Sequence, residues 1–403
     1  MKSLKALYRI GAGPSSSHTM GPERIARRFL TLFPDAAHYR VTLYGSLAAT
    51  GRGHGTDTVI RRVMPADTEV IFASENTEIE HPNTMDLTAE YRDHTETRRA
   101  YSLGGGAIAF RGEANEEEPE IYTLSTFREI ADLCRERGWR LSDYVFVTEG
   151  EEIREYLLTV WKTMCACIDE GLSTTGILPG GLGVARKAHD LYEHRDASEP
   201  ADVAEDRLVC AYAYATAEQN ASGGTVVTAP TCGAAGVMPA ALKYMQVTHD
   251  FSDDRIVRAL AAGGLVGNLI KTNASISGAE CGCQAEIGSA TSMTAAALAE
   301  LFDRPIAELE YAAELSMEHH LGLTCDPVRG LVQIPCIERN AVAALRAINA
   351  ISLAGFLTNT RKVSFDTIVR TMYETGRDLG RGYRETSEKG LASLYRDQDE
   401  GRA

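Results

Sequence analysis

The sequence predicts an α+β fold, in which a small N-terminal α/β domain precedes a larger all-α domain. Three observations lead to this prediction. Positions 1–111 mix strand-like and helix-like patterns, an acidic stretch interrupts the chain at 112–120, and the apolar spacing beyond it is mostly helical. We therefore place the small domain at residues 1–120 and the helical domain at residues 121–403.

The elements of the small domain follow from local patterns. Residues 39–44 and 69–73 are expected to be strands, because apolar and polar residues alternate and many side chains are β-branched. Residues 22–32 are expected to form a helix, since they follow a loop rich in serine, threonine and glycine. Residues 107–111 are a further candidate strand. Together these segments indicate a compact mixed domain.

The second domain is predicted from helical periodicity. The segment GEANEEEPE at 112–120 is typical of a solvated turn or linker. Apolar, alanine-rich runs at 206–218, 256–270 and 292–301 favour buried helices. We expect residues 150–395 to be all-helical, broken only by glycine-rich loops.

Composition excludes several classes of partner. The chain has 403 residues, a formal net charge of −15 and a pI of about 5.2, so its surface repels nucleic acid and anionic membranes. No apolar run approaches the length of a membrane-spanning helix, so none is expected, and the N-terminal segment 1–11 is too short and polar for a signal peptide. The nine cysteines are therefore expected to be thiols or metal ligands in a reducing cytoplasm.

Cys283, Cys325 and Cys336 lie among glycine, proline and polar turn residues, as loop cysteines do. Their separations match no short metal motif, and spacing alone leaves buried thiols as the common alternative. Thiolates are the ligands of iron–sulfur clusters, and a [4Fe–4S] cluster normally takes four. Three cysteines on such a cluster would leave one iron open as a Lewis acid.

The two segments that hold these cysteines, with three other segments, resemble the iron–sulfur-dependent L-serine dehydratases (L-serine ammonia-lyases), in the single-chain form with fused small (beta) and helical (alpha) domains. The resemblance implies conversion of L-serine to pyruvate and ammonia on a [4Fe–4S] cluster bound by Cys283, Cys325 and Cys336, within amino-acid catabolism and gluconeogenesis. The segments that carry it are GAGPSSSHTMGPERIA (11–26), LYGSLAATGRGHGTD (43–57), SGGTVVTAPTCGAAGVMPA (222–240), NASISGAECGCQAEIGSATSM (273–293) and EHHLGLTCDPVRGLVQIPCIERNAV (318–342).

A run of small hydroxyl residues precedes the first predicted helix. Hydroxyls, free backbone N–H groups and a helix N-terminus together make a receptor for an anion such as an amino-acid carboxylate. Helix capping alone would explain one such residue but not the whole run. With the family resemblance, we expect substrate binding by Ser15, Ser16, Ser17 and Thr19.

Two histidines are candidates for the base that removes the α-proton of serine. His54 lies between glycines in GRGHGTD, where the backbone can approach closely, and Asp57 is placed to orient or tune its ring. His18, in the serine run, is the second candidate. An α-proton beside a carboxylate is weakly acidic, so the base needs an electrophile nearby, and the open iron would serve.

Lys271 and Asn273 lead into Cys283 and are expected to line the same pocket as substrate-binding residues, although Lys271 in solvent is an equal alternative. Cys281 stands where relatives usually carry an apolar residue. A fourth ligand, a spare thiol and a packing residue are the alternatives, and a fourth ligand is the least expected, because residues two positions apart on a helix do not share a face.

Other functions remain as alternatives. The glycine-rich segment 222–225 is typical of phosphate cradles, including that of pyridoxal phosphate, but no lysine lies in a recognisable pyridoxal motif, so we expect no pyridoxal phosphate. Elimination from threonine or a hydroxy acid, an iron–sulfur sensor without catalysis, and a metal-free scaffold are the rival hypotheses.

The remaining expectations concern partners and the C-terminal segment. L-serine is the expected small-molecule partner, and a homodimer is expected from symmetry base rates. Some family members end in a cysteine that reaches back towards the active site. No cysteine follows Cys336 here, so that contribution must be absent or made differently.

Overall fold

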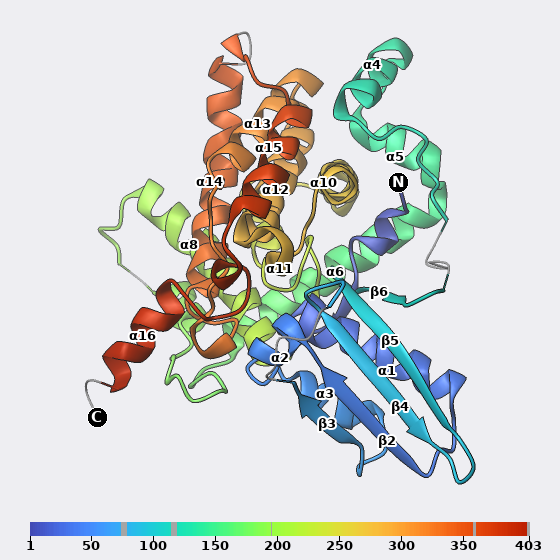
Figure 1. Cartoon of the computed structure of the whole chain (residues 1–403). Coiled ribbons are helices and arrows are strands. Elements are labelled where there is room, and N and C mark those ends of the chain that lie inside the picture. Colours follow the sequence, from blue (N-terminus) through green and yellow to red (C-terminus); the bar gives the residue numbers. More distant parts are fainter. Residues whose placement is uncertain (74–78, 114–118, 195, 358–359, 401–403) are drawn as a thin grey trace.

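The structure, a computed structural model, describes residues 1–73, 79–113, 119–194, 196–357 and 360–400. A large helical body carries a smaller sheet-bearing domain at one end (Figure 1). The predicted α+β class, with a small N-terminal α/β domain and a larger helical domain, is confirmed. The acidic segment expected to be a linker lies partly outside the described residues, at 114–118, so its role stays a prediction.

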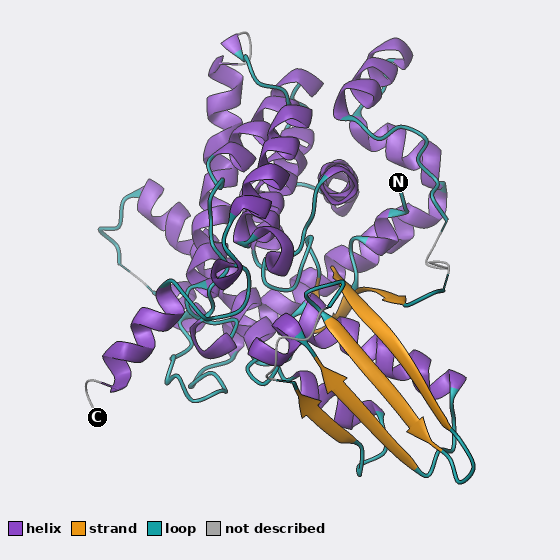
Figure 2. Cartoon of the chain, in the orientation of Figure 1, coloured by secondary structure: helices purple, strands orange, loops and turns teal. Residues whose placement is uncertain are grey.

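The small domain is built on a five-stranded sheet with the order β3-β2-β4-β5-β6. Strands β2 and β3 pair in parallel, and every other neighbouring pair is antiparallel. Figure 2 shows these strands gathered in one corner of the molecule with helices behind them. The strands are β2 (His38–Leu43), β3 (Glu69–Phe72), β4 (Thr84–Glu90), β5 (Thr95–Gly104) and β6 (Ala107–Phe110).

Three short helices complete this domain: α1 (Gly21–Leu32), α2 (Gly45–Thr50) and α3 (Thr56–Val63). Phe29 and Ile60 are fully buried against the sheet, so the apolar stripe of each helix faces the core. The predicted helix and the three predicted strands of this region are confirmed to within two residues, whereas β4 and β5 were not predicted.

The helical body packs long helices around α10, whose middle is buried on all sides. A buried helix of this kind is rich in alanine and glycine, since neighbouring helices approach it closely from several directions. The helices of this body are α4 (Phe127–Arg137), α5 (Leu141–Glu149), α6 (Glu151–Ser173), α7 (Ala188–Glu193), α8 (Ala201–Ala221), α9 (Val237–His249), α10 (Asp253–Asn273), α11 (Gly278–Cys281), α12 (Ser289–Leu301), α13 (Ile306–Glu318), α14 (Cys336–Leu357), α15 (Phe365–Asp378) and α16 (Leu391–Glu400).

The expectation that residues 150–395 contain only helices and loops was wrong at one place. Strand β7 (Thr225–Val227) pairs antiparallel with β1 (Ile10–Ala12). The glycine-rich segment before β7 is also hydrogen-bonded to the segment that leads into the serine run, since the Gly13 N–H donates to Gly224 O at 3.0 Å. A two-stranded pairing of distant segments leaves no local periodic signal, which is why helical patterning missed it.

The first residues of the chain pack within the helical body. Leu4 and Tyr8 are fully buried there, and the Tyr8 hydroxyl donates to Leu260 O at 2.9 Å. The chain then enters the small domain through β1. The domain boundary at residue 120 stays a prediction.

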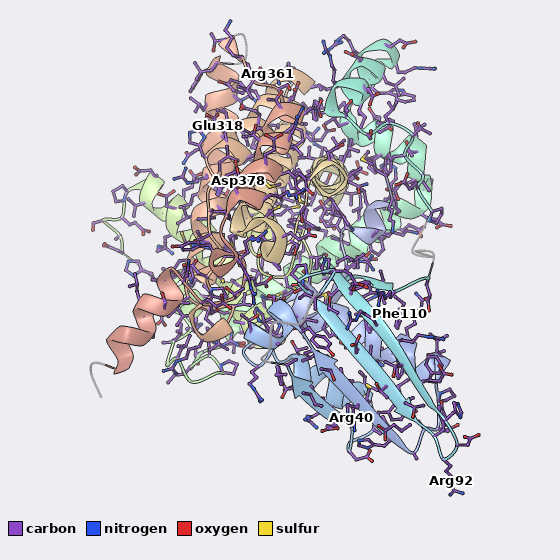
Figure 3. All side chains as sticks on the ribbon, viewed as in Figure 1. Arg40, Arg92, Phe110, Glu318, Arg361 and Asp378 are labelled. Carbon is purple, nitrogen blue, oxygen red and sulfur yellow. The ribbon has the colours of Figure 1, made fainter. Side chains whose placement is uncertain are left out.

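Charged side chains cover the outer surfaces of both parts. Figure 3 labels Arg40 and Arg92 on the small domain and Arg361 on the helical body. Arg40 lies 2.6 Å from Glu69, and Arg361 lies 2.7 Å from Glu310. The first pair is exposed and the second is partly buried, and both are separate from the site described below.

Among the described residues, one helix, α14, is long and apolar enough to cross a membrane by length and composition alone. Core helices of folded domains pass the same test. Helix α14 packs against α8, α12 and α13, and it begins at one of the three predicted cluster ligands, Cys336. This packing accounts for its buried apolar residues, while Val342, Leu353, Phe356 and Leu357 stay exposed.

Candidate active site

Five segments that are far apart in the sequence converge between the small domain and the helical body. They bring together two groups of buried side chains. His18, His54 and Glu385 form the histidine group, and Cys283, Glu286 and Cys325 form the cysteine group. Within each group, the atoms that could bind a metal lie within 4.8 Å of one another.

The histidine group is centred on one carboxylate. Glu385 Oε1 lies 3.4 Å from His18 Nδ1 and 3.8 Å from His54 Nε2. The two imidazole rings stack with their centroids 4.4 Å apart. All three side chains are buried, with exposed fractions of 0%, 1% and 4% for His18, His54 and Glu385. Polar groups buried this deeply need hydrogen-bond partners, which for the two rings are supplied by neighbouring residues.

The hydrogen bonds assign the tautomers of both rings. His54 Nδ1 lies 2.9 Å from Thr50 O, and a carbonyl can only accept, so Nδ1 carries the proton and Nε2 keeps its lone pair. Ser46 Oγ donates to Glu385 O at 2.7 Å, so it accepts from His18 Nε2 at 3.0 Å. Nδ1 of His18 then accepts from the Ser17 hydroxyl at 2.9 Å. His54 Nε2 is therefore the ring nitrogen left available for a proton.

Burial lowers the pKa of both imidazoles. The pKa of His54 falls to about 4, because the surrounding protein disfavours the charged ring. The pKa of His18 is lowered well below its usual value by burial and then by the neighbouring His54. Both rings are therefore neutral at pH 7, the form in which an imidazole accepts a proton.

The serine run holds these histidines in place. The π-helical turn Ser16–Met20 is capped by Ser15, whose hydroxyl accepts from the His18 N–H at 3.1 Å. The Thr19 hydroxyl donates to His54 O at 2.9 Å. Ser16 and Ser17 are buried as well. The run thus positions both rings, and its predicted contact with substrate stays a prediction.

A close backbone contact fixes the loop that carries His54 against the helical body. A Cβ atom on Gly53 would lie 2.6 Å from Arg329 O and from the Gly330 carbonyl, so only glycine fits there. The contacted turn lies between the two later cysteines in the sequence. Asp57 was expected to orient the His54 ring, but the structure gives that role to Thr50 and Glu385.

The cysteine group contains three acidic or potentially acidic side chains in close contact. Glu286 Oε2 lies 4.0 Å from Cys283 Sγ and 3.9 Å from Cys325 Sγ. Cys283 and Cys325 are 4% and 5% exposed, and Cys336, at the start of α14, is partly buried beside them. The structure therefore gathers the three predicted ligands around one place.

Charge distribution in this group depends on Arg339. The pKa of Cys283 is lowered to about 6 by a hydrogen bond from Cys325 and then by the Arg339 guanidinium. Donating that bond raises the pKa of Cys325, while burial raises the pKa of Cys336 and that of Glu286, the latter to about 8. One cation among four acidic groups leaves most of them protonated.

The surroundings of the cysteine group fit a bound cluster. A Cβ atom on Gly278 would lie 2.7 Å from Glu286 Oε2 and 3.1 Å from Cys325 Sγ, so glycine keeps this wall open. Among the described residues, the buried Glu385 Oε2 has no hydrogen-bond partner. Three thiols, an open wall and an unpaired acceptor are the features expected where a cationic metal centre binds.

Glu385 joins the two groups. Its N–H donates to Cys325 O at 2.7 Å, and the Cys325 N–H donates to Tyr383 O at 2.8 Å. Burial and the nearby Glu286 raise the pKa of Glu385 well above its usual value. Its backbone adopts a φ of 56°, a region that non-glycine residues rarely enter. The segment after α15 thus returns to complete the site.

The structure does not bring Lys271 and Asn273 to the cysteine group. Lys271 Nζ donates to Ala6 O at 3.2 Å. The exposed Asn273 donates to Ser125 O at 2.7 Å and to Leu269 O at 2.9 Å. Both lie at the end of α10, so the predicted contact with substrate has no support from their positions.

Cys281 also lies apart from the ligand group. It is fully buried, burial raises its pKa to about 11, and a Cβ atom on Gly376 of α15 would lie 2.5 Å from its Cβ. These are the surroundings of a packing residue.

Sequence reasoning missed several residues of the site. Glu385 sits in a polar C-terminal segment that resembles ordinary surface, and Ser46 follows an unremarkable strand end. Arg339 and Glu286 lie three residues from a predicted ligand, and that spacing, one helical turn, was the available signal.

Comparison with known proteins identifies the family. A family model for the serine dehydratase beta chain matches residues 3–64, and a model for the serine dehydratase alpha chain matches residues 67–392. The two matches meet within the small domain, after α3.

Curated proteins are similar over nearly the whole chain. A protein named L-serine dehydratase from Streptomyces coelicolor is 42% identical, covering 97% of this chain and 98% of its own length. L-serine dehydratase 1 from Escherichia coli is 40% identical, with 97% and 99% covered. L-serine dehydratase from Haemophilus influenzae is 39% identical, with 97% and 99% covered.

Proposed function

This chain belongs to the serine dehydratase family, with the beta-chain and alpha-chain regions in one polypeptide, and on this premise we propose that it is an L-serine dehydratase dependent on a [4Fe–4S] cluster. The names of its relatives support the reaction, which converts L-serine to pyruvate and ammonia. One observation carries the proposal: Glu385 connects His54, whose Nε2 has a free lone pair, to the three-cysteine site. Its carboxyl lies beside His54, and its backbone N–H donates to Cys325 O.

Cys283, Cys325 and Cys336 would hold the cluster, with Arg339 offsetting negative charge on the sulfur ligands. When bound, such a cluster would supply a Lewis-acidic iron that binds the substrate and stabilises the departing β-hydroxide. The proposal includes no pyridoxal phosphate, since the glycine-rich segment before β7 pairs with the backbone of Gly13.

His54 is the proposed base. Its Nε2 accepts the α-proton of serine, while the Nδ1–H bond to Thr50 O holds the ring in the required tautomer. Burial favours the protonated form of Glu385, but a positive charge on the ring 3.8 Å away favours its ionised form, and the ion pair then stabilises the imidazolium. Loss of water from serine leaves aminoacrylate, which tautomerises and hydrolyses to pyruvate and ammonia without further help from the protein.

His18 has a supporting role in this proposal. Both of its ring nitrogens are engaged, by Ser17 and Ser46, so it lacks the free lone pair of His54. It stacks on His54 and fixes that ring from one side. Hydroxyls of the serine run are the proposed contacts for the polar ends of the substrate.

We also propose a cytoplasmic homodimer. All nine cysteines are free of disulfides, in keeping with a reducing compartment. Helix α14 exposes apolar side chains that a second copy would cover, namely Val342, Leu353, Phe356 and Leu357. Light scattering on the wild-type protein and a Phe356→Glu variant tests the dimer, and a monomeric wild-type protein would contradict it.

The reaction is tested by anaerobic purification with iron and sulfide reconstitution, followed by a pyruvate assay on L-serine. We expect about four irons per chain, and activity that air abolishes. L-threonine assayed in parallel reports on the substrate class. Activity in iron-free protein that a carbonyl reagent removes would overturn the cluster and indicate pyridoxal phosphate.

A further inference from the structure

His18, His54, Glu385, Cys283 and Cys325 are all buried, so a substrate reaches them through a neighbouring cavity. Of the cavities described, one of about 410 Å³ borders the histidine group. Ser46 lines this cavity, and its hydroxyl bonds both His18 Nε2 and Glu385 O. Thr386, which follows Glu385, lines it too. Only the side chain of Ser46 therefore separates the cavity from the ring of His18.

Three arginines line the cavity on the side of the helical body. Arg377 is exposed on the last turn of α15, next to Asp378, which Figure 3 labels. Arg381 and Arg384 follow it in the segment that leads to Glu385. A cavity with this lining favours an anionic occupant.

The guanidinium groups keep donors for a ligand. Arg384 Nη1 donates to Glu280 O at 3.1 Å, but its Nε is buried and has no hydrogen-bond partner among the described residues. Arg377 contacts the Tyr373 ring, whose centroid is 5.8 Å away. A buried donor without a partner is costly, and a bound anion would remove that cost.

The two carboxylates of the cavity are already engaged. Glu80 lies 2.7 Å from Arg111, and Glu280 accepts from Ser275 and lies 3.6 Å from His81. Arg384 also interacts with Glu280, since its charge adds to the hydrogen bonds that lower the pKa of that carboxyl against the effect of burial, but its buried Nε keeps no partner among the described residues. Arg377 and the Nε of Arg384 are therefore the groups that can receive a new anion. A planar guanidinium matches a carboxylate through paired N–H donors.

We propose that this cavity is a carboxylate-binding antechamber, in which Arg377 and Arg384 hold the carboxylate of a small amino acid or keto acid beside the reaction centre. As an access site for L-serine it rests on the proposed function. As a carboxylate site it does not, and pyruvate leaving the centre would use the same arginines.

A chemical footprint tests the site without requiring turnover. The reconstituted protein is treated anaerobically with phenylglyoxal, and modified arginines are mapped by mass spectrometry. We expect L-serine and pyruvate each to protect Arg377 and Arg384, and L-serinamide, which lacks the carboxylate, to protect neither. Arg370, exposed on the same helix and paired with Glu374 at 2.9 Å, should react equally in every sample. Equal modification with and without carboxylates would overturn the proposal.

Kinetics then tests access. Arg377→Gln should raise the KM for L-serine about tenfold, the lower range for loss of a charged hydrogen bond, with kcat largely kept, whereas Arg370→Gln should change neither. An unchanged KM in Arg377→Gln would contradict the proposal that L-serine enters through this cavity. Protection of Arg377 in a protein inactive on L-serine would keep the carboxylate site and reject the proposed function, so the two failures are distinguishable.

Discussion

The histidine group and the cysteine group lie side by side but differ in how completely the polypeptide satisfies them. In the histidine group, hydrogen bonds fix both rings and leave one lone pair, on His54 Nε2. In the cysteine group, acidic side chains crowd together, and burial raises the pKa of Glu286 to about 8. The polypeptide alone therefore fixes the neutral ring that we propose as the base, whereas the crowded acids of the cysteine group favour the proposed binding of a cationic partner.

This difference separates what each group contributes to folding and to chemistry. The histidine group is held by backbone carbonyls and serine hydroxyls, so it should persist without a cofactor. The cysteine group should rearrange or stay protonated without one, because Arg339 is a single cation among several acids. Substitutions in one group should leave the other intact, and the predictions below test that independence.

The largest effect is expected from Cys325→Ala. Loss of one of three ligands should reduce bound iron to near zero and activity to background. The histidine group should survive, and ¹⁵N shifts of the histidine rings would show unchanged tautomers for His18 and His54. Cys134→Ala, a buried cysteine of α4, is the matched control and should retain iron. Full iron content in Cys325→Ala would remove this cysteine from the ligand set.

A smaller loss is expected from Glu385→Gln. Glutamine cannot ionise, so the imidazolium that forms at His54 gains no counter-charge, and kcat should fall about a hundredfold, a usual contribution of general acid–base groups. Iron content should stay at the wild-type level. Glu388→Gln, on the exposed side of the same segment, should be neutral. Loss of iron in Glu385→Gln would mean that this residue belongs to the cysteine group, and the comparison above would fail.

The activity on L-serine should depend only slightly on pH between pH 8 and about 5.5. His54 must be neutral to accept a proton, and its pKa of about 4 means that protonation disables it only as the pH falls towards 4. The kcat/KM for L-serine should therefore stay level from pH 8 down to about 5.5, with iron content measured at each pH. A half-loss of kcat/KM near pH 6.5 would indicate a solvated histidine as the base.

The sequence predicted the parts of this site whose signals are local. The sequence around Cys283, Cys325 and Cys336 predicts them as ligands, and the glycine-flanked loop predicts His54 as a base. The structure brings these residues together, and their roles stay predictions. Lys271 and Asn273 were chosen because they precede a ligand in sequence. However, a position close to a ligand in the sequence does not decide where a side chain points. At the end of α10, Lys271 donates to the backbone of Ala6 and Asn273 to the backbone of Ser125.

The rest of the site depends on where the chain returns in space. Glu385 reaches the histidines because Cys325 pairs with the backbone of Tyr383 and Glu385, which lie beyond two further helices in the sequence. No helical or strand period encodes such a contact. The same limit applies to β1 and β7, which pair although one lies near the start of the chain and the other beyond its midpoint.

The smallest effect is expected from Cys281→Ala, which tests how sharply the cysteine group is bounded. Two residues from a ligand, Cys281 nevertheless packs against Gly376 on α15. Its truncation should cost about 1 kcal/mol of unfolding free energy, as typical core substitutions do, and leave iron content and kcat within about twofold. Thermal unfolding and iron analysis check both. Since Cys283 turns towards Glu286 and Cys281 towards α15, loss of iron in this variant would require a fourth thiolate ligand and close the iron proposed to bind substrate.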